Sequence, residues 1–129
     1  MACKIQILIE FKNSLVNFLD ELIEQFPEEG DLIVLRIFLN DQVPIAEIMN
    51  TFVTKLLPLK EVVKKRDESF FLNNNILFEK LNKDKVNHFK TLWTSPKLDA
   101  DDRKVIWSWY DLFISMAEKY TKWACLFLN

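Results

Sequence analysis

The chain has little of the chemistry that most enzymes need. Its 129 residues include one glycine, Gly30, and one histidine, His88. A single glycine excludes the glycine-rich loops that cradle phosphates, and a single histidine excludes every catalytic arrangement that needs two. The carboxylates Glu21 and Glu24 are explained by solvation on a helix surface. Asp99 is predicted to be the N-cap of the last helix, with Asp101 and Asp102 in its first turn. The sequence therefore predicts a noncatalytic protein without a cofactor.

Metal ligands are scarce as well. His88 and Asp84 are four residues apart and would share one face of a helix, which offers two ligands. No cysteine or E-x-x-H pattern supplies a third, and a zinc site needs at least three from the protein. We therefore expect a surface pair at this position and no metal site.

Excess charge and long apolar runs are also lacking, and a disulfide is not favoured. The formal net charge is -2, so no global field would draw the chain to nucleic acid or to an anionic membrane. No run approaches the roughly 20 apolar residues that span a bilayer. Cys3 and Cys125 lie near opposite ends, and no charged-then-apolar leader precedes the first expected helix. We expect an intracellular, reducing environment and no membrane contact.

Apolar and aromatic residues are abundant, at 50% and 13% of the chain. This composition excludes disorder, and a chain of this length buries roughly two thirds of its unfolded surface on folding. Without an internal repeat or a flexible linker, residues 1–129 are expected to form a single domain.

The spacing of apolar residues predicts helices. Stripes at intervals of three or four cover 5–26, 45–57 and 100–120, with Pro44 in a first helical turn and Pro58 as a kink or split. Residues 31–41 fit a buried strand or a short helix; we favour helix, because no other segment alternates with a period of two. Residues 67–82 are less regular, and a short helix is expected over 84–93. The fold class is all-α, a single compact bundle of five to seven helices.

The last expected helix carries the aromatic run WSWYDLF at 107–113. On one broad face, taken as the core side, lie Val105, Ile106, Trp109, Leu112, Phe113, Met116, Ala117 and Tyr120. On the opposite side lie Trp107, Tyr110 and Ile114, which we predict to form a protein interface, because tryptophan and tyrosine concentrate at interface centres. The alternative is a central helix that its own domain covers on both sides.

A basic run provides a second candidate surface. It consists of Lys55, Lys60, Lys64, Lys65 and Arg66. Contacts of this kind would bind nucleic acid weakly and with steep salt dependence. Glu61, Asp67 and Glu68 dilute the charge, so a solvated helix end is favoured over a nucleic-acid site.

Three blocks resemble short uncharacterised helical proteins of nucleocytoplasmic large DNA viruses of algae and protists. They are FLDELIEQFPEEGDLIVLRIFLNDQVPI at 18–45, KVNHFKTLW at 85–93 and DDRKVIWSWYDLFISMAEKY at 101–120. The resemblance implies a viral origin and a place in the virion, such as a minor capsid component. It carries no catalytic or binding residue onto this chain, because the family has no assigned activity.

The sequence thus predicts a noncatalytic interaction or structural protein that contacts other viral proteins or a second copy of itself. The host cytoplasm, the virus factory or the virion is its expected location, and no small-molecule substrate is evident. One alternative is a nucleic-acid-associated regulator that uses the basic run. Another is a host-interaction module such as a cell-death antagonist, which an apolar groove for a partner helix would support.

Overall fold

The computed structural model describes the backbone of residues 3–70 and 95–127, and the side chains of 5–70 and 95–122. These residues are mostly helical and contain no strand, which confirms the all-α class. The expected count of five to seven helices stays a prediction. So does the helix expected over 84–93, which lies outside the described residues together with most of 67–82.

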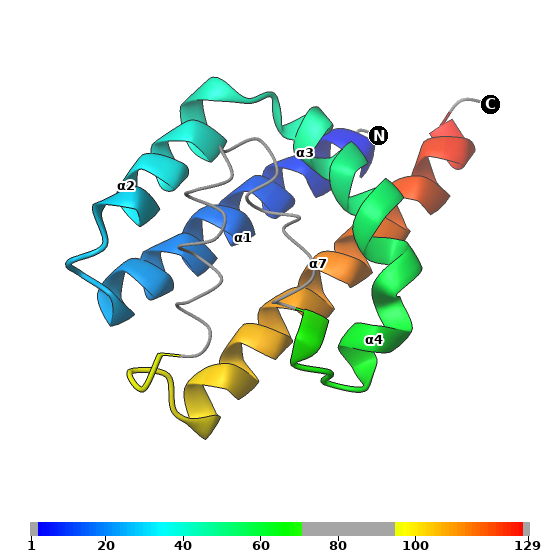
Figure 1. Ribbon diagram of the computed structural model, residues 1–129. Helices are drawn as coiled ribbons and strands as arrows, with labels where there is room; N and C mark the ends of the chain where they lie inside the picture. The colour runs from blue at the N-terminus through cyan, green and yellow to red at the C-terminus, as the bar shows by residue number, and fades with distance from the viewer. Residues whose placement is uncertain (1–2, 71–94, 128–129) are drawn as a thin grey trace.

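Two long helices form the frame of the fold. Helix α1 spans Cys3–Gln25 and helix α7 spans Ala100–Phe127. They run antiparallel and make the most extensive contact between any two elements described (Figure 1). The start of α7 is fixed by a reciprocal cap: the Asp102 N–H donates to Asp99 Oδ1 at 2.8 Å, and the Asp99 N–H donates to Asp102 Oδ2 at 3.1 Å. The predicted role of Asp99 as N-cap is confirmed.

The ambiguous segment 32–39 is helical. Helix α2 spans Gly30–Ile37 and continues into a π-helix, η1, at Phe38–Gln42. It folds back along α1, where the Arg36 Nε donates to Asp20 Oδ1 at 2.6 Å. Leu32 and Leu35 both face the core. Residues three apart lie on the same face of a helix, whereas in a strand they would point to opposite faces.

The next segment is a chain of short helices divided at proline. Pro44 caps helix α3, Ile45–Thr51, which passes into the π-helix η2 at Phe52–Leu56, the 3₁₀ turn η3 at Leu57–Leu59 and helix α4 at Lys60–Lys64. Pro58 lacks the N–H that a continuous helix would need, so the expected split is confirmed. Arg66 ends α4 with a positive φ of 58°, in the position where glycine is usual.

Aromatic rings from three elements meet at the centre of the core. The Phe113 ring of α7 lies 5.7 Å from Phe52, 5.7 Å from Phe18 and 6.0 Å from Phe11, in edge-to-face geometry. Pairs of this kind add about 0.5–1.5 kcal/mol beyond the area that they bury. The central position of Phe113 fixes the rotation of α7 about its own axis, and so determines which side chains face outward.

Candidate functional site

The predicted interface residues of α7 are buried. Trp107, Tyr110 and Ile114 are each 5% exposed and belong to the hydrophobic core. The prediction that they lie open to a partner is therefore wrong, and the alternative, a helix covered on both sides by its own domain, holds for this side. Burial also raises the pKa of the Tyr110 hydroxyl above its ordinary value.

Among the described residues, the turn after α4 supplies part of the cover over Trp107 and Tyr110. The Phe70 ring lies 6.1 Å from that of Trp107 and 5.4 Å from that of Tyr110. The Arg66 guanidinium lies over the Trp107 ring at 5.6 Å from its centroid. Neither contact follows from the helical period of α7, which is why the sequence pattern alone gave the wrong side.

The opposite edge of the buried face is open to solvent. Val105 is 47% exposed and Leu112 is 37% exposed, although both were predicted to face the core. Trp109 and Met116, also predicted as core, are half-buried beside them. These four residues, at spacings of four, three and four, form an apolar edge stripe along α7. The other members of the predicted core face are buried, and Phe113 and Ala117 are fully so.

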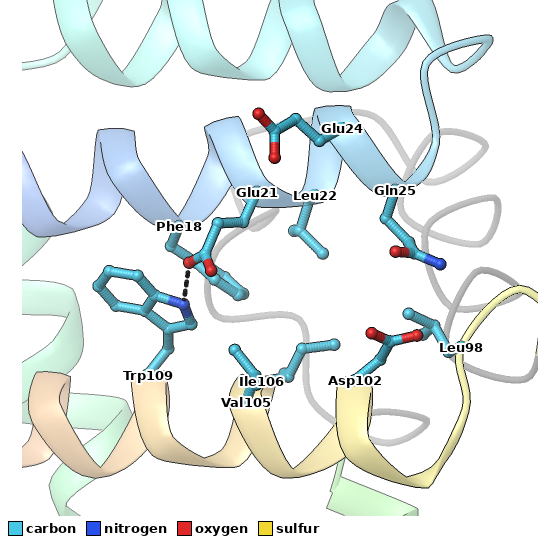
Figure 2. Close-up of a pocket in the computed structure, with 10 residues that line it drawn as sticks. All are labelled: Phe18, Glu21, Leu22, Glu24, Gln25, Leu98, Asp102, Val105, Ile106 and Trp109. Atoms are coloured by element: carbon cyan, nitrogen blue, oxygen red, sulfur yellow. Dashed lines mark hydrogen bonds between the residues drawn. The ribbon is translucent and has the colours of Figure 1, made fainter.

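A groove runs beside the edge stripe, between the second half of α1 and the first half of α7 (Figure 2). Its volume is about 400 Å³. Glu21 and Gln25 point into it from α1, and Ile106 and Asp102 point into it from α7. A second hollow of about 330 Å³ shares Glu21, Val105 and Trp109 with the first and extends to Leu112. The two hollows form one continuous surface, which we call the α1–α7 groove.

Trp109 is a rigid wall of this groove. Its indole Nε1–H donates to Glu21 Oε2 at 2.5 Å, which joins the two helices across the groove (Figure 2). The ring is stacked on Phe113 with centroids 6.0 Å apart and also contacts Phe18 at 5.8 Å. The tryptophan is therefore held in one orientation before any partner arrives, so little side-chain entropy remains to be lost on binding.

The charged residues that the structure describes along the α1–α7 groove are acidic. They are Glu21, Glu24 and Asp102, and no lysine or arginine of 5–70 or 95–122 lines either hollow. Asp102 is engaged in the helix cap, whereas Glu24 has no ion pair recorded among the described residues. Three carboxylates gather here on a chain whose formal net charge is only -2. The groove thus combines an apolar floor with a negative rim.

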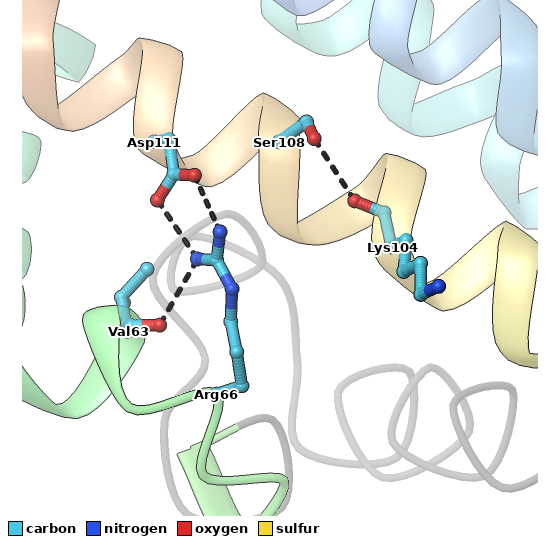
Figure 3. Close-up of polar contacts among 5 residues, drawn as sticks. All are labelled: Val63, Arg66, Lys104, Ser108 and Asp111. Carbon is cyan, nitrogen blue, oxygen red and sulfur yellow. Dashed lines mark hydrogen bonds and ion pairs between the residues drawn. The ribbon is translucent and has the colours of Figure 1, made fainter.

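The basic run is partly neutralised by α7. Lys60 Nζ lies 2.7 Å from Glu118 Oε2. The Arg66 guanidinium donates to both oxygens of Asp111 at 2.9 and 2.7 Å, as Figure 3 shows. The hydrogen bond and charge of Glu118 raise the pKa of Lys60, and those of Asp111 raise the pKa of Arg66. At least two of the five cations are thus committed within the molecule, which weakens the case for a nucleic-acid surface.

Other candidate sites are not found in the described part of the chain. Across residues 3–70 and 95–127, no three histidine, cysteine, aspartate or glutamate side chains are placed to hold a metal ion. No described helix is long and apolar enough to cross a bilayer. The predicted pair of His88 and Asp84 lies outside the described residues.

Comparisons with protein-family models, with curated proteins and with solved structures found no match to this chain. The likeness to viral proteins stays a prediction.

Proposed function

We propose that this chain is a noncatalytic interaction protein whose partner binds in the α1–α7 groove. The observation that carries the proposal is the edge stripe, in which exposed Val105 and Leu112 flank a tryptophan that the core already holds in place. Rigid tryptophans with apolar neighbours are typical centres of protein interfaces. The interface thus moves from the predicted Trp107 side to the opposite edge of the same helix.

The shape of the stripe favours a macromolecule over a metabolite. From Val105 to Met116 it extends over three helical turns, or roughly 16 Å at 1.5 Å per residue. Small-molecule sites usually bury most of their ligand in a concave pocket. A surface with a long apolar edge matches an elongated partner better, and the proposal includes neither a substrate nor a cofactor.

The expected biological setting remains part of the proposal. The resemblance to proteins of large DNA viruses supports a role in the virion or its assembly, such as a minor capsid component, inside the infected cell. The groove also favours a second candidate, a host-interaction module such as a cell-death antagonist, because such a module would accept a partner helix. The paired Lys60 and Arg66 leave the nucleic-acid regulator without comparable support.

Affinity capture with two matched double variants tests the function. Val105→Ser with Leu112→Ser alters the groove, and Ile33→Ser with Ile37→Ser alters an equally exposed apolar face of α2. Tagged chains are used to capture partners from infected cells or purified particles, with identification by mass spectrometry. We expect the α2 variant to retain the wild-type partners and the groove variant to lose them. Retention of the same partners by the groove variant would place the interface elsewhere.

A further inference from the structure

We infer that the α1–α7 groove accepts a positively charged amphipathic α-helix of another protein. This inference depends on the proposed function, because it names the chemistry of the partner at the same site. Two independent observations carry it. The spacing of the edge stripe indicates that the partner is a helix, and the negative charge of the rim indicates that this helix is positively charged.

The spacing of the edge stripe is that of a helix–helix seam. Val105, Trp109, Leu112 and Met116 repeat at intervals of four, three and four, the a/d pattern by which one helix packs on another. Their inner edges already touch the core, and their outer edges are exposed. A helix laid along this seam would add one more member to the bundle and cover Val105 and Leu112. An extended peptide has a period of two and would match only part of the stripe.

The rim of the groove selects cations. Glu21 and Glu24 lie one turn apart on α1 and both line the groove; Glu21 points toward α7, and Glu24 lies on the side of α1 away from α7 (Figure 2). Only one oxygen of Glu21 accepts the Trp109 indole, which leaves the other for a second donor. A lysine or arginine beside the apolar face of the docked helix would therefore lie near these carboxylates, as charged residues flank the seam of a coiled coil. An acidic helix would meet like charge.

Two designed peptides serve as probes. Both are 18-residue amphipathic helices with leucine at the same positions, spaced three and four apart. One carries lysine at every charged position and the other carries glutamate. Binding is followed on the ¹⁵N-labelled chain by the indole N–H signal of Trp109, which Trp109→Phe identifies by its disappearance. We expect the lysine peptide to shift this signal saturably and the glutamate peptide to leave it in place.

Isosteric variants test whether the rim carboxylates act on the peptide. Glu21→Gln with Glu24→Gln removes two charges while keeping an acceptor for the Trp109 indole. Glu47→Gln with Glu61→Gln removes two exposed charges that do not line the groove, on α3 and α4, as the matched control. We expect the rim variant to bind the lysine peptide with about fivefold lower affinity, which is the effect of losing two surface ion pairs. The control variant should bind it with nearly unchanged affinity. Leu112→Ser should lower the affinity for the lysine peptide further.

The inference is overturned if the glutamate peptide binds as tightly as the lysine peptide, or if the rim variant binds like the control. A dimer in sedimentation that Leu112→Ser dissociates would make a second copy the occupant and also overturn it. These outcomes are separate from the fate of the proposed function. If captured partners depend on Val105 and Leu112 while the lysine peptide fails to bind, the interaction role stands and only the partner chemistry is wrong.

Discussion

Helix α7 carries two apolar stripes that differ in what covers them. On the Trp107 side, the rings of Trp107 and Tyr110 pack against Phe70, and the guanidinium of Arg66 lies over Trp107. On the Val105 side, Val105 and Leu112 are exposed beside the groove and its acidic rim. Both stripes are apolar and both contain a tryptophan, yet one stabilises the fold and the other is open for contact. Composition does not separate them, because the cover comes from elements distant in the sequence.

The difference also shows what an aromatic residue contributes in each place. Trp107 is almost fully buried, so its ring stabilises the domain by leaving water. Trp109 is half-buried, and its indole joins α1 to α7 through Glu21. Substitutions that separate stability from binding therefore test the difference between the two tryptophans.

The largest loss is expected from the residue between the two stripes. Phe113 is fully buried and its ring contacts aromatic rings of α1 and η2. Phe113→Ala should lower the free energy of unfolding by about 3–5 kcal/mol, which is enough to abolish a cooperative melt in a marginal domain. Circular dichroism against temperature measures the loss. Leu112→Ala, the adjacent but exposed position, is the control and should melt close to wild type.

The two tryptophans should rank in the order of their burial. Trp107→Ala should cost about 3 kcal/mol, because it leaves a cavity under Phe70 and Arg66. Trp109→Ala should cost about half as much, since part of its ring is already in water. Urea unfolding of both variants gives the comparison. A larger loss of unfolding free energy for Trp109→Ala would contradict this order. It would support the sequence-based prediction, in which Trp109 faces the core and Trp107 faces outward.

The cover over Trp107 depends in part on Arg66. This residue makes a favourable ion pair with Asp111 but has an unfavourable backbone conformation with a positive φ. Arg66→Ala keeps the positive φ of 58° and loses the bidentate pair with Asp111, so it should cost about 1 kcal/mol. Arg66→Gly loses the same pair but relieves the left-handed strain, also worth about 1 kcal/mol, and should be nearly neutral. Chemical denaturation of both variants gives the difference. Equal losses would show that the backbone at this position is not strained.

A smaller, pH-dependent effect should report burial of the Tyr110 hydroxyl. Its folded pKa is raised above the unfolded value of 10.0 because burial disfavours the phenolate. The associated stability is fully present below pH 10 and is lost as the pH rises toward the folded pKa. Tyr110→Phe should remove this loss, a difference of less than about 1 kcal/mol at pH 10.5. Parallel loss of stability in both proteins would indicate an exposed hydroxyl.

Much of the fold follows from local sequence, because caps, prolines and apolar spacing act within a few residues. The cap at Asp99, the split at Pro58 and the helix over 32–39 were all predicted and are present. Each depends on neighbours in the chain, and none requires knowledge of the tertiary packing.

The rotation of α7 was harder to predict, because its apolar residues cover more than half of the helix circumference. The polar residues hold the clearer signal, at spacings of three and four: Asp101, Lys104, Ser108, Asp111, Ser115, Glu118 and Lys122. The stripe that they form lies opposite the centre of the buried face, on which Tyr110, Phe113 and Ala117 lie. The groove itself could not be predicted, because it combines the rim of α1 with an edge of α7.

The central claim is that Val105 and Leu112 face solvent while Ile106 and Ile114 face the core. Methyl NMR with a soluble paramagnetic probe tests it on one sample, because the probe broadens only signals near the surface. We predict strong broadening of the Val105 and Leu112 methyl signals and sharp signals from Ile106 and Ile114. The reverse pattern would contradict the account, since the edge stripe would then be core and the α1–α7 groove would have no apolar wall.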